Sequence, residues 1–255
     1  MNIIVCYKIT PDEQDIIIAP DRNISLEKAA LKIGDYDLNA IEAGARLAAD
    51  YDTRLIGLTV GGDVVDDSKL KKSLLARGPN ELIIFKDAAL PQASSGLTAI
   101  ALSAALSKIE SFDLILCGEG SADRYSQQVG IQLGEVLNVP VINSVSEIEL
   151  REGFAYVTRL TETHVEHLEV ALPAVLCVIA DMNVPRIPSM KDILSAGKKP
   201  SLLLGADDVQ TGDLTDPVQI ISVLAPEQTQ RACAITESTD DENIKAFFAT
   251  VQIKF

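Results

Sequence analysis

The residues most suited to chemistry in this chain lie in one stretch, CGEGSADRYSQQVG, which runs from Cys117 to Gly130. It follows the apolar run Leu114–Leu116, so it is predicted to leave the end of a buried strand, and it leads into an apolar helical pattern. Glycines such as Gly118 and Gly120 let a backbone approach a ligand, and the free N–H groups of a helix start favour an anion. The stretch predicts a binding loop.

The match of this loop to nucleotide fingerprints is incomplete. Asp123 stands where a dinucleotide loop has its third glycine, and neither a full G-x-G-x-x-G nor a G-x-x-x-x-G-K-[ST] motif occurs. A glycine after a strand is more often a turn, and Gln127 and Gln128 fit equally well as exposed helix residues. The pattern alone leaves nucleotide binding and an ordinary turn both open.

Other catalytic constellations are missing from the sequence. The four cysteines lie far apart and read as buried reduced thiols rather than as a metal or redox site (Cys6, Cys117, Cys177 and Cys233). His164 and His167 fall in an alternating strand pattern, where a spacing of three places them on opposite faces. With no G-x-S-x-G motif either, we expect no catalytic nucleophile, no metal and no autonomous enzyme.

The composition restricts the class of partner. A chain of 255 residues with a net charge of −15 lacks the clustered cations that binding to nucleic acid needs. The N-terminal sequence has no signal-peptide pattern, and no apolar run approaches the roughly 18 residues of a membrane span. We expect a cytoplasmic protein that binds a small molecule or another protein and does not insert into a membrane.

Strand and helix patterns alternate through the first 140 residues, as in a doubly wound, mostly parallel, Rossmann-like α/β sheet. Three successive strands follow at 142–150, 154–160 and 165–172, which predicts a β-meander extension. Beyond Pro200 the alternation is lost, and only Ile244, Phe247, Phe248 and Val251 form a helical apolar stripe. We predict an α/β domain over 1–200, which the family resemblance described below makes a nucleotide-binding domain, and a C-terminal arm over 201–255. The arm packs on a partner subunit or folds back on its own domain.

The loops after the strands of such a sheet converge on one edge, where ligands bind. The loops that meet there are predicted to be those after Cys6, before Asp37, at Gly61–Gly62 and at Gly118–Gln128.

A second unusual stretch, DMNVPRIPSMKDILSAGKKP, runs from Asp181 to Pro200. Pro185 and Pro188 stiffen it, Arg186 and Lys191 supply charge, and Met190 is an adaptable apolar side chain among polar ones. It reads either as a docking loop or as an ordinary connection whose methionine packs into the core.

From residue 2 to residue 200 the chain resembles the electron-transfer flavoprotein beta subunit family, most closely its bacterial Fix-type members. The resemblance rests on CYKITPDEQD, GDYDLNAIEAG, CGEGSADRYSQQVG and LPAVLCVIADMNVPRIPSMKDILSAGKKP, in this order. It implies an adenine nucleotide, AMP or a second FAD, held by a set of matching positions. These cofactor-binding positions are Cys6, Tyr36, Asp37, Val60, Gly61, Gly118, Gly120, Asp123, Gln127, Gln128, Val129 and Gly130.

The resemblance also implies partners. An alpha subunit would complete a heterodimer and hold most of a shared, redox-active FAD. A recognition loop, with Arg186, Met190 and Lys191 at matching positions, would dock an acyl-CoA dehydrogenase or reductase, including carnitine-linked ones. The complex would carry electrons between that enzyme and a quinone-linked, iron–sulfur or ferredoxin-linked partner. Electron transfer needs two flavins in proximity rather than a protein acid or base.

Two positions depart from the family pattern. Val129 replaces a common threonine beside the nucleotide, and Leu160 replaces a common acidic residue of an inter-subunit ion pair. A different function also stays open, a stand-alone adenine-nucleotide sensor whose output is protein binding.

Overall fold

The computed structural model describes residues 1–210, 214–227 and 241–251, and it divides into two compact units. The larger unit comprises Met1–Ile17 and Ser25–Ile221, and the smaller comprises Ile18–Ile24 and Ser222–Phe255. The expected thiol of Cys233 lies outside the described residues.

A sheet dominates the larger unit and has nine strands within the described residues. In spatial order these are β11 (Val165–Ala171), β10 (Phe154–Leu160), β9 (Val141–Arg151), β12 (Ala174–Val178), β8 (Leu114–Gly118), β1 (Asn2–Cys6), β6 (Arg54–Gly61), β7 (Glu81–Lys86) and β13 (Ser201–Leu204). Neighbours from β9 to β13 run parallel, and β10 runs antiparallel to both of its neighbours. The predicted doubly wound sheet is confirmed.

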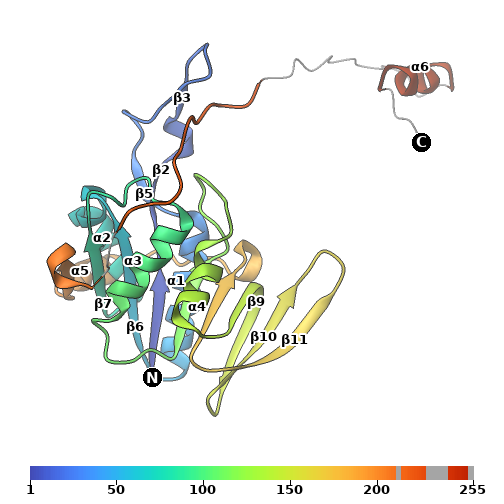
Figure 1. Ribbon diagram of the computed structural model, residues 1–255. Coiled ribbons are helices and arrows are strands. Elements are labelled where there is room, and N and C mark those ends of the chain that lie inside the picture. The colour runs from blue at the N-terminus through green and yellow to red at the C-terminus, as the bar shows by residue number, and fades with distance from the viewer. Residues whose placement is uncertain (211–213, 228–240, 252–255) are drawn as a thin grey trace. The chain divides into compact units, whose positions relative to one another are not determined.

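Helices cover both faces of the sheet (Figure 1). They are α1 (Asp35–Asp50) and α2 (Ser68–Leu75), which pack on one face, and α3 (Ser95–Leu106) and α4 (Val129–Leu137), which pack on the other. The central strands β1 and β8 are nearly continuous apolar runs because both of their faces are buried. Ile3 and Val5 face the layer of α1, whereas Ile4 and Cys6 face the layer of α3.

The meander and the shorter elements complete this unit. In β9 to β11, more exposed and less exposed residues alternate along much of each strand, because this part of the sheet is covered on one face only. A two-stranded sheet in this unit is formed by β2 (Ile9–Pro11) with β5 (Leu31–Ile33). A second two-stranded sheet pairs β3 (Ile17–Ile18) with β4 (Ile24–Ser25), and Ile18 and Ile24 are assigned to the smaller unit. Helix α5 (Met190–Ala196) follows β12, and β13 pairs with β7, so the first residues after Pro200 belong to the main sheet.

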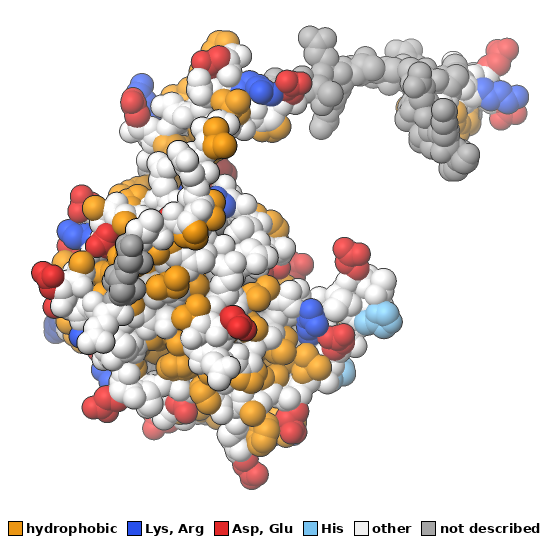
Figure 2. Space-filling model, viewed as in Figure 1, with side chains coloured by type: hydrophobic (Ala, Val, Ile, Leu, Met, Phe, Trp, Pro, Cys, Tyr) orange, Lys and Arg blue, Asp and Glu red, His pale blue; other side chains and the backbone are white. Residues whose placement is uncertain are grey.

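The outer surface of α3 and α4 carries little charge (Figure 2). Helix α3 contains no charged side chain, and α4 contains only Glu135. Ile100 and Val136 are exposed on these two helices. An acidic protein therefore presents a largely uncharged helical face here.

The smaller unit holds helix α6 (Asp241–Val251), where the sequence predicted a helical apolar stripe. Its exposed apolar side chains are Ile244, Phe247 and Phe248, while the side chain of Val251 lies outside what is described. Elsewhere in this unit Arg22 forms an ion pair with Glu227 at 3.0 Å. None of the helices in the described residues is long and apolar enough to cross a membrane.

Candidate functional site

The candidate site is a pocket of about 230 Å³ at the carboxyl ends of β1 and β8. These two strands are neighbours, but the chain leaves β1 toward β6 on one side and later returns to β8 on the other. A doubly wound sheet opens a crevice at such a reversal of strand order. The pocket therefore lies where this fold binds ligands.

The pocket brings together nine of the twelve predicted cofactor-binding residues. They are Cys6, Asp37, Val60, Gly118, Gly120, Gln127, Gln128, Val129 and Gly130. The other three lie beside it or behind it. Tyr36 packs against Tyr125 with ring centroids 5.2 Å apart, Asp123 pairs with the pocket residue Lys8, and Gly61 faces Val65 at the end of β6.

Asp37 is a buried carboxyl group in the pocket wall, in the first turn of α1. Burial raises its pKa to about 7, against the smaller opposing effects of the backbone amides of Lys8 and Gly118 and of the Lys8 charge. The Lys8 amide donates to Asp37 Oδ2 at 2.7 Å. A Cβ at Gly118 would lie 2.8 Å from Asp37 Oδ1, so only a glycine lets β8 approach this carboxyl group so closely. Near neutral pH this pocket can therefore gain or lose one charge.

Two cations balance the carboxyl groups of the pocket. Lys8 follows β1 and forms an ion pair with Asp123 at 2.6 Å. Burial opposes the ionisation of Asp123, but the hydrogen bonds and charge of Lys8 outweigh it, so its pKa lies below the ordinary value. Arg124 lines the same pocket and donates to the Ala93 carbonyl at 3.1 Å. The pocket thus places two cations, Lys8 and Arg124, beside the carboxyl groups of Asp37, Glu119 and Asp123.

The N-terminus of α4 forms one wall of the pocket, since Gln128, Val129 and Gly130 all line it. The cap residue Gln128 makes no side-chain cap bond, so it leaves the N–H groups of the first turn without a side-chain acceptor. A Cβ at Gly130 would lie 2.3 Å from Cys177 Sγ, which shows how closely this helix end packs on the sheet. The wall therefore presents backbone donors that suit a phosphate or another anion.

The cysteines near the pocket are buried and free, as the sequence predicted. Cys6 and Cys117 line the pocket, and Cys177 lies beside Cys117 on the paired strand β12. A hydrogen bond with Cys117 and burial both raise the pKa of the Cys177 thiol, so it stays neutral at pH 7. A neutral buried thiol contributes packing rather than nucleophilic chemistry.

Sequence reasoning missed one side of the pocket. This side is formed by residues of α3 and of the loop before it: Leu90, Pro91, Ala93, Ser95, Thr98 and Leu102. Ser94 caps this helix by accepting from the Leu97 amide at 3.2 Å. The serine pair at 94 and 95 predicts a helix start, but nothing local in the sequence shows that this start meets the loop after β8.

The predicted docking residues lie on a separate surface, between β12 and the end of α5. Met190 is 73% exposed at the first position of α5, so it does not pack into the core. Ile187 is 93% exposed and Leu194 is 71% exposed beside it, while Lys191 is also exposed. The charge of Arg186 is paired with Glu42 of α1 at 2.6 Å.

The two positions that depart from the family pattern lie apart from each other. Val129 is in the pocket wall, where it adds apolar surface. Leu160 ends β10 and is 39% exposed, and its neighbour Arg159 pairs with Glu166 at 3.2 Å.

A comparison of the sequence with protein-family models finds a match that covers most of the chain. The model described as "Electron transfer flavoprotein domain" matches residues 23–208. The match includes most of the sheet, the glycine-rich loop, the pocket residues after β8 and the whole exposed segment around Met190.

Proposed function

Because the chain belongs to the electron transfer flavoprotein domain family, we propose that it is the beta subunit of a heterodimeric electron-transfer flavoprotein of the Fix type. The observation that carries the proposal is the combination of two separate surfaces in one family domain. One is a cation-bearing pocket at the strand-order reversal, and the other is an exposed apolar segment around Met190. The first suits a nucleotide and the second suits a protein partner.

The pocket is proposed to hold AMP. Lys8, Arg124 and the first turn of α4 supply the positive charge and the donors that a phosphate requires. AMP is the smaller of the two nucleotides that the family resemblance implies, and it is the occupant proposed for this pocket of about 230 Å³. Val129 offers no hydroxyl, so the polar contacts would come from the backbone, from the two cations and from the serine, threonine and glutamine side chains of the pocket.

The redox chemistry is proposed to belong to FAD held mainly by an alpha subunit. That flavin would supply the electron storage, and this chain would bind its nucleotide, exclude water at the pocket and orient the docking surface. The uncharged outer face of α3 and α4 supports a heterodimer, since the buried centres of protein interfaces are depleted in charge. The chain would act in the cytoplasm as an electron carrier subunit and not as an enzyme with its own acid, base or nucleophile.

The exposed segment is proposed to dock an acyl-CoA dehydrogenase or reductase, carnitine-linked or not, with a quinone- or ferredoxin-linked protein as the other redox partner. Ile187, Met190 and Leu194 are each at least 71% exposed and project from a short connection and one helix. Exposed apolar side chains grouped in this way mark an interaction site, and methionine adapts to irregular surfaces.

The substitution Met190→Glu tests this docking role. It places a charge in the centre of the apolar surface, so the second-order rate of electron exchange should fall at least about tenfold, equivalent to roughly 1.4 kcal/mol. The rate is measured by stopped-flow reduction of the complex with an acyl-CoA dehydrogenase from the same cells. Val165→Glu is the matched control, because Val165 is 60% exposed on β11 and receives the same charge. An exchange rate for Met190→Glu equal to that of the control would reject the docking role.

A further inference from the structure

The exposed segment around Met190 begins with residues that belong to no helix or strand. Residues 183–188 lie between a 3₁₀ turn (Ala180–Met182) and α5, and no element includes them. Within the described part of the chain, no backbone-to-backbone hydrogen bond holds these residues. A connection of this kind, with Val184 83% exposed and Ile187 93% exposed, would sample many conformations unless side chains fixed it.

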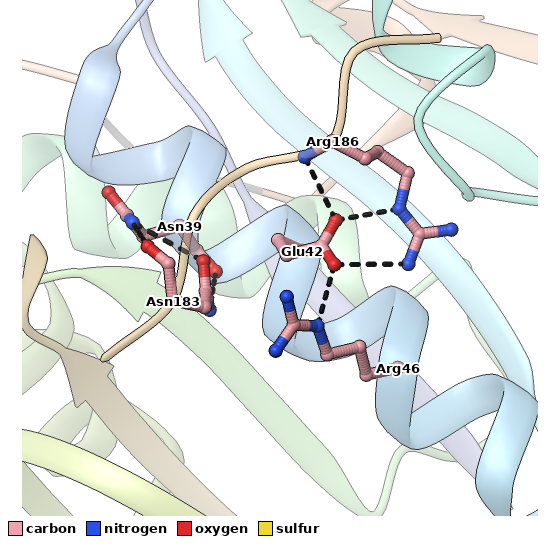
Figure 3. A network of polar contacts seen from close by, with 5 residues as sticks. All are labelled: Asn39, Glu42, Arg46, Asn183 and Arg186. Carbon is pink, nitrogen blue, oxygen red and sulfur yellow. Dashed lines mark hydrogen bonds and ion pairs between the residues drawn. The ribbon is translucent and has the colours of Figure 1, made fainter. Parts of the chain in front are cut away.

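Helix α1 supplies the first of these fixing contacts, an exchange of amide hydrogen bonds (Figure 3). The Asn39 side chain donates to the Asn183 carbonyl at 2.7 Å and to the Ala180 carbonyl at 2.8 Å. In return, the Asn183 side chain donates to the Asn39 carbonyl at 3.0 Å. Asn39 is buried, so these bonds are sheltered from water and fix the start of the segment to the helix.

The second contact is a charged one, made one turn further along α1. Arg186 Nε donates to Glu42 Oε2 at 2.6 Å, and Arg186 Nη2 donates to Glu42 Oε1 at 3.3 Å. The Arg186 backbone amide also donates to Glu42 Oε2, at 3.2 Å. Glu42 therefore holds both the side chain and the main chain of the segment (Figure 3).

Glu42 keeps its charge although it is buried. Its side chain is 5% exposed, and burial alone would raise its pKa, but hydrogen bonds from Arg186 and Arg46 lower the pKa below the ordinary value. Arg46 donates to Glu42 Oε1 at 2.6 Å from the next turn of α1, and among the described residues it makes no hydrogen bond or ion pair with the segment. One buried carboxylate is thus shared between an arginine of the helix and an arginine of the segment.

We propose that Asn39 and Glu42 are positioning residues for partner docking. They fix Asn183 and Arg186 to α1, so that the apolar side chains from Val184 to Leu194 face the partner in one arrangement. Prior ordering of a docking segment lowers the entropy lost on binding. The inference rests on the proposed docking function, and it assigns Arg186 to internal anchoring rather than to a direct contact with the partner.

Three variants separate anchoring from direct contact. Glu42→Gln removes the shared charge, and Arg186→Gln removes the anchor on the segment side. Arg46→Gln is the matched control, because it removes a bond to the same carboxylate without touching the segment. Each variant is prepared in the full chain with its alpha subunit, and its bound nucleotide is quantified to establish that the pocket is intact.

The functional readout is steady-state electron transfer with an acyl-CoA dehydrogenase from the same cells, with the carrier as the varied substrate. Glu42→Gln and Arg186→Gln should each raise the KM for the carrier about fivefold or more and leave kcat within about twofold, and the double variant should add little. Arg46→Gln should keep the wild-type KM. Hydrogen exchange of the backbone amide at position 186, which donates to Glu42, should be faster in the first two variants only.

The outcomes separate a failure of the proposed docking function from a failure of the positioning role alone. If wild-type protein exchanges no electrons with any acyl-CoA dehydrogenase of those cells, the proposed docking function fails, and this inference fails with it. If the wild type is active and Arg186→Gln raises KM while Glu42→Gln does not, Arg186 contacts the partner directly and the positioning role is wrong. Unchanged hydrogen exchange in Glu42→Gln would also overturn the inference.

Discussion

Replacement of Gly130 by alanine probes how tightly the start of α4 packs on the sheet beside the pocket. A Cβ at this position would lie 2.3 Å from Cys177 Sγ and 3.4 Å from Cys117 Cβ. Unbonded heavy atoms prefer separations of about 3.5–4.0 Å. The helix and the sulfur must therefore move apart by about 1 Å or more, and Cys177 is buried on a strand that pairs on both sides.

The size of the effect follows from two opposing contributions. Overpacking of a core costs about 1–3 kcal/mol, whereas alanine in place of glycine in a helix gains up to about 1 kcal/mol. We expect the free energy of unfolding to fall by about 1–2 kcal/mol. Because Gln128 and Val129 line the pocket from the same turn, displacement of the helix should also lower the nucleotide content.

Urea unfolding of four proteins measures this coupling: wild type, Gly130→Ala, Cys177→Ala and the double variant. Cys177→Ala removes the sulfur that the new methyl group meets, so the double variant should recover stability, with a coupling free energy of about 1 kcal/mol or more. A Gly130→Ala protein as stable as wild type, or a coupling within about 0.3 kcal/mol of zero, would refute the close packing described here.

Three further predictions concern the pocket and the docking helix. The pKa of Asp37 is raised to about 7, so in the folded chain it keeps its proton at pH values where the unfolded chain has lost it. Asp37 therefore lowers stability as pH rises from about 4 to about 7, and no further above. Relative to wild type, Asp37→Asn should gain about 2–3 kcal/mol in unfolding free energy between pH 5 and pH 8; equal pH dependence of the two proteins would contradict this. Asp123→Ala should lower the nucleotide content, which is measured by chromatography, and full retention of nucleotide would show that the site is misplaced. The same substitution should change the free energy of unfolding by less than about 1 kcal/mol, because the ion pair of Asp123 with Lys8 is partly exposed. Ser189→Ala removes the capping box of α5 and should speed hydrogen exchange across that helix, by an amount equivalent to about 1 kcal/mol, with no effect on exchange in α4.

The sequence was sufficient for the sheet and for much of the pocket, because both depend on local patterns. Apolar runs such as Leu114–Leu116 specify buried parallel strands, and glycines at strand ends specify turns. Since the carboxyl ends of parallel strands share one edge, the strand pattern alone places residues as distant as Cys6, Asp37 and Gln128 together.

The rest depends on contacts that no local pattern encodes. Glu42 in an amphipathic helix resembles any exposed acidic residue, and only the folded chain shows that it is buried under Arg186, 144 residues away. The raised pKa of Asp37 comes from burial by surrounding elements, so its sequence neighbours do not reveal it. Likewise β13 pairs with β7 only because the chain returns to that sheet edge after α5.

The nucleotide content of the protein co-purified with its alpha subunit tests the central proposal most directly. Nucleotides are released by heat, separated by chromatography and quantified per heterodimer, with Asp123→Ala as the pocket control. The account predicts one AMP and one FAD per heterodimer, with only the AMP reduced in the variant. Two FAD and no AMP would contradict the proposed occupant of the pocket, and a complex without any flavin would contradict the electron-carrier function itself.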